Sequence, residues 1–205
     1  MKIYRHGIVF LVLAVAILVS GCRGVKREKP VVLCTTTMMA AAVEAIAGDT
    51  VKIETLIPHG MCPGHFDLAP NQAKRIADAQ CVLIHGWEPF KEKIKEFRHG
   101  TSGLHVVNVP ENWMVPNVHQ QAVTETGRML KKCFPYNSKL FDKRAEKYSK
   151  EVENAAKETR KRFSDAGSGQ TIVVASDMQS TFLKWAGFSV AAEYGRLDEM
   201  SANNI

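Results

Sequence analysis

The 205-residue sequence lacks the motifs of several common enzyme classes. It contains no Gly-x-x-x-x-Gly-Lys phosphate loop, no Gly-x-Gly-x-x-Gly dinucleotide motif, and no Ser-His-Asp set beside a nucleophile elbow. These absences argue against a nucleotide-dependent enzyme and against a serine hydrolase. Nothing in these motifs indicates an enzyme, and we predict that the protein is not one.

The body of the chain also lacks an excess of charge of one sign. The net charge of +6 comes from 27 Lys and Arg against 21 Asp and Glu, and most of it lies in the first 30 residues. Residues 31–205 carry 21 basic and 20 acidic side chains, so no basic face is expected and no nucleic-acid partner is predicted. A composition of 45% hydrophobic and 23% charged residues indicates a globular chain.

The N-terminus predicts an exported protein. A basic start precedes an apolar run over residues 8–19, which is shorter than the roughly 20 residues of a membrane-spanning helix. This order is typical of a signal peptide, here residues 1–21. The following Val-Ser-Gly-Cys resembles the bacterial lipobox, which implies cleavage before Cys22, a lipid on its thiol, and a basic tether over residues 22–30. The alternative is an ordinary signal peptide followed by an incidental cysteine.

Strand and helix patterns alternate along the first half of the body. Short apolar runs indicate strands, and each is followed by a helix-forming segment. This alternation predicts an α/β fold with a parallel sheet in an N-terminal lobe over residues 31–132. The predicted strands are 31–34, 51–56, 81–84 and 104–109, and the predicted helices are 38–47, 71–77, 88–97 and 118–132.

A different pattern follows in the middle of the chain. From Phe141 to Phe163, apolar side chains recur every three or four residues among charged ones, which predicts one long helix over residues 137–165. Such a helix joins two lobes or forms a coiled coil, and its Ala and Thr positions make a weak coiled-coil seam. We therefore predict a connecting helix. Residues 170–205 then begin a second α/β unit, an incomplete C-terminal lobe.

Four cysteines remain after Cys22. They are Cys34, Cys62, Cys81 and Cys133, and an exported location permits disulfides among them. Four thiols allow three full pairings, between which sequence does not choose. Two of them, Cys34 and Cys81, lie in apolar strand-like runs, so we expect them to be buried thiols.

A loop rich in Gly, Pro and His follows the second predicted strand, over residues 58–70. It lies at the carboxyl end of a strand, where open α/β sheets bind ligands. His65 offers an imidazole, a common ligand of transition metals. On spacing alone, a single histidine in a loop is more often a surface residue than a metal ligand, and Cys62 with His65 makes only half of a zinc site.

Taken in order, the lipobox, the strand–helix–strand start, this loop and the long helix resemble the solute-binding lipoproteins of zinc and manganese ABC transporters. The resemblance implies two α/β lobes joined by a rigid helix, with the metal between them. It implies a monomer that captures a divalent metal ion, zinc or manganese, without an organic cofactor. The protein would be anchored outside the cell membrane by its lipid and would deliver the ion to a membrane permease.

The resemblance also assigns candidate ligands. The family's first ligand is the His of a Pro-His-x-(Tyr/Phe)-Glu-Pro loop, and it maps to His65 in Pro-Gly-His-Phe-Asp. The second maps to Glu111, just before a Trp-Met-Val-Pro run, with His119 as a rival. The third maps to Asp177, and the fourth falls beyond Ile205.

Other readings stay open beside this one. His85 and Glu88 follow the third predicted strand and could contribute ligands, although a structural role suits them better. The missing family histidines leave the alternative of a truncated, non-binding paralogue or a surface lipoprotein without transport activity. A metalloenzyme is disfavoured, because no general base stands near His65.

Overall fold

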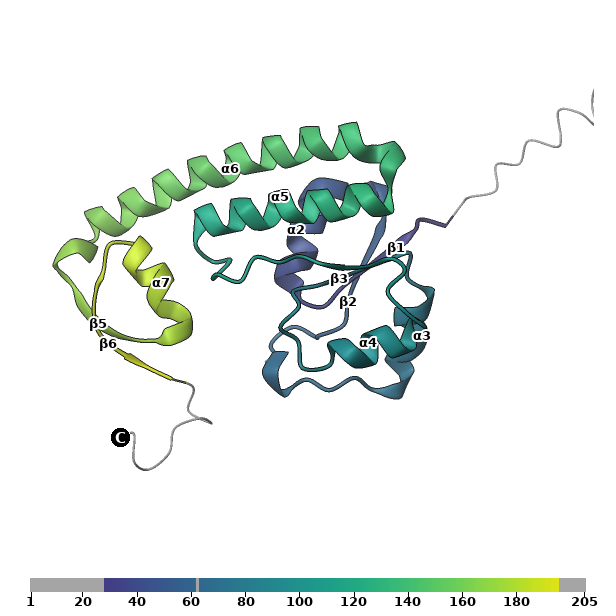
Figure 1. Ribbon diagram of the computed structural model, residues 1–205. Coiled ribbons are helices and arrows are strands. Elements are labelled where there is room, and N and C mark those ends of the chain that lie inside the picture. Colours follow the sequence, from purple (N-terminus) through teal and green to yellow (C-terminus); the bar gives the residue numbers. More distant parts are fainter. Residues whose placement is uncertain (1–27, 62, 196–205) are drawn as a thin grey trace, which may run out of the picture.

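The computed structural model describes residues 28–61 and 63–195, so the predicted signal peptide and Cys22 lie outside the described residues. A four-stranded parallel sheet with the order β2-β1-β3-β4 forms the first lobe (Figure 1). Its strands are β1 (Val31–Cys34), β2 (Lys52–Thr55), β3 (Cys81–Ile84) and β4 (Leu104–Val106). The parallel sheet predicted from the alternation is confirmed.

Helices cover both faces of this sheet, as Figure 1 shows. Alternate residues of each strand point to opposite faces, so Val32 packs on one side of β1 and Leu33 on the other. One face packs against α2 (Thr37–Ala47), α5 (Pro116–Cys133) and the start of α6 (Ser138–Asp165). The other packs against α3 (Pro70–Asp78) and α4 (Lys91–Phe97). Burial on both faces explains why the strands read as continuous apolar runs.

Short elements complete the first lobe. The 3-10 turns are η1 (Gly48–Thr50), η2 (Pro63–His65) and η3 (Pro135–Asn137). Helix α2 begins where the Thr36 hydroxyl accepts a hydrogen bond from the backbone N–H of Met39, at 3.2 Å. It ends at Gly48, whose φ of +52° suits a residue without a Cβ.

Helix α6 is continuous over 28 residues, about 42 Å of helix, which confirms the long helix predicted from the apolar stripe. Its first turn inserts Phe141 into the core of the first lobe, where the side chain is fully buried. Near its other end, Phe163 contacts the rings of Phe182 and Phe188. The helix therefore packs on both parts of the molecule, above α5 and the sheet in Figure 1.

The chain continues after α6 into a smaller unit. Turn η4 (Ser168–Gln170) leads into β5 (Ile172–Ser176), α7 (Asp177–Trp185) and β6 (Ser189–Tyr194). Strands β5 and β6 pair in parallel, and the whole forms a partial second lobe. No helix within the described residues is long and apolar enough to span a membrane.

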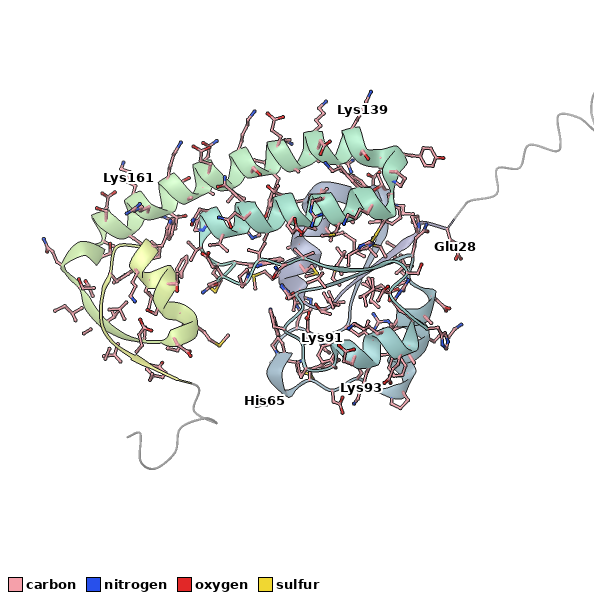
Figure 2. The ribbon with its side chains drawn as sticks, viewed as in Figure 1. Glu28, His65, Lys91, Lys93, Lys139 and Lys161 are labelled. Carbon is pink, nitrogen blue, oxygen red and sulfur yellow. A yellow bond between two sulfur atoms is a disulfide. The ribbon has the colours of Figure 1, made fainter. Side chains whose placement is uncertain are left out.

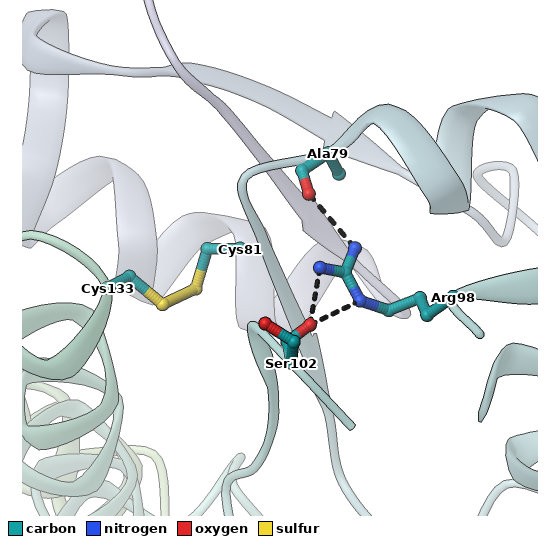
Figure 3. Close-up of a disulfide and its surroundings, with 5 residues drawn as sticks. All are labelled: Ala79, Cys81, Arg98, Ser102 and Cys133. Atoms are coloured by element: carbon teal, nitrogen blue, oxygen red, sulfur yellow. Dashed lines mark hydrogen bonds between the residues drawn. A yellow bond between two sulfur atoms is a disulfide. The ribbon is translucent and has the colours of Figure 1, made fainter. Parts of the chain in front are cut away.

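The cysteines differ in part from the prediction. Cys34 is a buried free thiol, as expected, and burial raises the pKa of its thiol far above the ordinary value. Cys81 is not a free thiol, because it forms a disulfide with Cys133 at the end of α5 (Figure 3). The apolar surroundings of Cys81 indicated burial correctly. They could not reveal a partner 52 residues away.

Candidate functional site

The order of the strands defines where a ligand site is expected. β1 and β3 are neighbours in the centre of the sheet, and the chain leaves them toward opposite edges, to β2 and to β4. Crevices form at the carboxyl ends of strands at such a switch point. Here the segments at that point are Thr35–Thr36, after β1, and residues 85–88, after β3.

The Glu88 carboxylate holds these two segments together. It is 1% exposed and accepts hydrogen bonds from the Thr35 hydroxyl (2.5 Å) and from the backbone N–H groups of His85 and Gly86 (2.7 Å each). The predicted helix from Glu88 is wrong at its start: α4 begins at Lys91, because the Glu88 side chain folds back onto the preceding backbone. The buried Glu88 carboxylate therefore holds the loop after β3 in its conformation and ties it to the segment after β1.

His85 is the second buried polar residue of this loop. Its Nε2 lies 2.9 Å from the Thr36 hydroxyl, and its ring stacks on Trp87 and meets Trp113 edge-on at 4.5 Å. Burial lowers the pKa of His85 despite the opposing charge of Glu88. The imidazole is therefore neutral at neutral pH, the form that can bind a metal ion.

A cavity of about 520 Å³ opens beside this loop, between the first lobe and the β5–α7–β6 unit. The loop after β3 contributes His85 and Trp87, and the loop after β4 contributes Glu111 and Trp113. Asp177 and Met178, in the first turn of α7, line it from the second part. The remaining lining residues are Met38, Val109, Pro110, Asn112, Met114, Ser176 and Gln179.

Two of the predicted ligands share this cavity. Glu111 and Asp177 are both exposed and come from different parts of the molecule. A hydrogen bond of 2.6 Å from the Asn112 side chain to the Met178 carbonyl joins the two segments that carry them. The cavity therefore combines two carboxylates, a buried imidazole and apolar walls.

His119 lies elsewhere. It stands in the first turn of α5, and its Nε2 is 3.1 Å from the Tyr148 hydroxyl on α6. With Trp113, Phe182 and other residues it lines a separate, largely apolar cavity of about 230 Å³. Burial lowers the pKa of His119. Of the two rivals for one ligand position, Glu111 is the one that lines the same cavity as Asp177.

His65 is at the end of the turn η2, in the loop between β2 and α3. It is exposed and lies away from α5 and α6, at the opposite side of the first lobe (Figure 2). The next residue, Phe66, anchors the loop by packing edge-on against Phe90, with ring centroids 5.3 Å apart. His65 is not among the described residues that line the cavity.

The four predicted ligands do not converge on one point. Among the described residues, Cys81, His105 and Cys133 form the one group of three or more potential metal-ligating atoms within 4.8 Å of one another. Sequence reasoning missed this group and the aromatic walls of the cavity. The one signal that could have indicated Trp87 and Trp113 is that both follow predicted strands, where the ligand-binding loops of α/β proteins lie.

This architecture defines a class. The chain is an α/β protein in which a single long helix connects a parallel-sheet lobe to a second α/β unit, with a cavity between them. More specifically, it belongs to the family described as "Zinc-uptake complex component A periplasmic" (ZnuA), whose sequence profile matches residues 32–205. This confirms the resemblance to metal-transporter binding lipoproteins that the sequence suggested.

Individual relatives are distant. The chain is 21% identical to the iron ABC transporter substrate-binding lipoprotein MtsA of Streptococcus pyogenes, over 80% of this chain and 61% of the relative. It is 24% identical to the manganese-binding lipoprotein MntA of Bacillus subtilis, over 93% of this chain and 71% of MntA. The chain thus spans about three fifths of the length of the first of these relatives.

The fold is shared with solved structures. The periplasmic zinc-binding protein TroA of Treponema pallidum matches with a TM-score of 0.74 and 20% identity, over 86% of this chain and 72% of TroA. A crystal structure of ZnuA matches with a TM-score of 0.72 and 16% identity, over 86% of this chain and 75% of ZnuA. TroA is described as a zinc-binding protein.

Proposed function

We propose that this protein is the exported solute-binding component of a metal ABC transporter, and that it captures a divalent metal ion, zinc or manganese, for a membrane permease. Family membership supports the class of function. The observation that carries the proposal is the cavity at the switch point of the sheet, into which both lobes contribute a carboxylate. A ligand held by both parts would link its binding to their relative position.

The donor atoms suit such an ion. Glu111 and Asp177 supply hard carboxylate oxygens, and Asp177 lies in the first turn of α7, where the helix dipole favours negative charge. Carboxylate ligands suit manganese, and mixed carboxylate and imidazole sets also accept zinc. His85 is the imidazole that already lines the cavity, and His65 is the one that the family motif assigns.

Titration calorimetry of the oxidised chain with zinc and with manganese tests this proposal. We expect Glu111→Gln and Asp177→Asn each to weaken binding by about tenfold or more, because each removes a charged ligand. His65→Ala tests the family assignment, and His119→Gln should bind like the parent. Asp142→Asn is the matched control, since Asp142 on α6 is an exposed carboxylate paired with Lys131 of α5.

The outcomes separate the alternatives. If the cavity variants bind as well as the parent, the ion is held elsewhere. If the parent binds neither ion, the chain is a non-binding lipoprotein of this family. The proposed anchor is tested separately, by mass spectrometry of the membrane fraction, which should find a mature N-terminus at a lipid-modified Cys22. An unmodified chain that begins at Met1 would contradict the anchor without touching the metal site.

A further inference from the structure

A second group of metal-ligating side chains lies at the other end of the sheet. Cys81 is the first residue of β3, Cys133 is the last residue of α5, and His105 is in the middle of β4. The register pairs His105 with Leu83, and paired neighbours point to the same face of a sheet. Leu83 and Cys81 are two residues apart on one strand, so their side chains point to the same face. Cys81 and His105 therefore both lie on the face of the sheet that packs against α5, where Cys133 is.

Their ligand atoms are already close to one another. The two sulfurs and a ring nitrogen of His105 all lie within 4.8 Å of each other. Two thiolates and an imidazole around a tetrahedral zinc ion are separated by about 3.6 to 3.8 Å, from Zn–S and Zn–N distances of about 2.3 and 2.0–2.1 Å. Small side-chain rotations would bring the three atoms to that spacing once the sulfurs are no longer bonded.

The backbone around the group is held in place. Arg98 donates hydrogen bonds to the carbonyls of Ala79 and Ser102, which precede β3 and β4, at 2.6 to 2.9 Å (Figure 3). The chain before β4 also packs tightly against the chain before β3, because a Cβ added to Gly103 would be only 2.8 Å from the Gln80 carbonyl oxygen. Arg98 therefore fixes the starts of the two strands that carry Cys81 and His105.

The surroundings of His105 favour the form of its imidazole that can bind a metal ion. Burial and the positive charges of Lys132 and Arg98 lower the pKa of His105, so its imidazole is neutral at neutral pH. The ring makes no hydrogen bond with another described residue. The group is also separate from the cavity, because Cys81 and His85 stand at opposite ends of β3, roughly 13 Å apart.

We propose that Cys81, Cys133 and His105 form a second, redox-controlled site for a thiol-preferring divalent cation such as zinc. In the oxidised chain the two sulfurs are bonded to each other and the site is closed. An external dithiol reductant transfers two electrons and two protons to the disulfide, which yields two thiols, and becomes a disulfide itself. Zinc then displaces the two thiol protons and binds both thiolates and the imidazole, with water as its fourth ligand.

The test compares the oxidised and reduced 205-residue chain, with Cys22 and Cys62 replaced by Ser so that the redox change is confined to one pair. Zinc stoichiometry is measured by equilibrium dialysis, and cobalt(II) serves as the spectroscopic probe. We expect the reduced chain to bind one more zinc per molecule than the oxidised chain. With cobalt it should show a sulfur-to-metal charge-transfer band and the intense d–d bands of a tetrahedral ion.

His105→Ala keeps both thiols and the disulfide, so it isolates the imidazole without removing the cross-link. We expect it to weaken the extra zinc site about tenfold or more and to alter the cobalt d–d bands, while His59→Ala, an exposed loop histidine, changes neither. Equal zinc binding by the reduced and oxidised chains would overturn the proposal. So would a His105→Ala variant with parental affinity, or a reduced chain that is unfolded with zinc present. The cavity is tested on the oxidised chain, so the two sites can fail independently.

Discussion

Replacing Glu88 by Gln should destabilise the protein strongly, although the two side chains have nearly the same shape. One Glu88 oxygen accepts from the Thr35 hydroxyl and the His85 backbone N–H, and the other accepts from the Gly86 backbone N–H. An ionised carboxylate is an acceptor at both oxygens. A Gln side chain can replace only one of them, and its NH₂ group would then face a backbone donor.

The size of the effect follows from these contacts. Losing the acceptor for the Gly86 N–H in a buried loop costs about 1 to 3 kcal/mol, and weakening two charge-assisted bonds to neutral ones costs roughly 1 to 2 kcal/mol more. We therefore expect Glu88→Gln to lower the free energy of unfolding by about 2 to 5 kcal/mol. Because the loop presents His85 and Trp87 to the cavity, metal binding there should weaken as well.

Urea unfolding followed by circular dichroism and tryptophan fluorescence measures this change. The matched control is Glu92→Gln on α4, where the carboxylate is exposed and pairs with Lys95 three residues on. That variant should unfold like the parent, since exposed ion pairs contribute little. If Glu88→Gln also unfolds like the parent, the buried carboxylate does not hold the loop in the way that its contacts indicate.

Three further predictions concern the first lobe. Reducing the Cys81–Cys133 disulfide in metal-free buffer should lower the free energy of unfolding by about 4 kcal/mol, because the unfolded chain then gains the entropy of an open loop of 52 residues. A decrease of less than about 1 kcal/mol in urea unfolding would contradict this. Phe141→Ala should cost about 3 to 5 kcal/mol in the same assay, because it empties a fully buried site that attaches α6, whereas truncating the partly exposed Leu140 should cost much less. The pKa of His85 is lower in the folded than in the unfolded chain, so the unfolded chain binds more protons at mildly acid pH and stability should fall below about pH 6.5. His85→Asn should flatten that slope in thermal melts across pH, and an unchanged slope would assign the effect to other groups.

The periodicity of the sequence was enough to predict the framework. Continuous apolar runs such as Val31–Cys34 and Cys81–Ile84 occur where a strand is covered on both faces, and this burial is what the parallel sheet requires. The stripe from Phe141 to Phe163 has the repeat of a helix, and the structure shows one unbroken helix there. These patterns are local, so each can be recognised without knowing what the segment contacts.

Tertiary structure alone decided which distant residues meet. Cys81 pairs with Cys133 because the end of α5 returns to the start of β3, and no spacing among the cysteines encodes that return. Glu111 lies in the same cavity as Asp177, while His119, only eight residues further on, is turned by α5 toward Tyr148. Such pairings depend on how helices pack across the sheet. They are set by distances in space between segments far apart along the chain, which local sequence patterns do not contain.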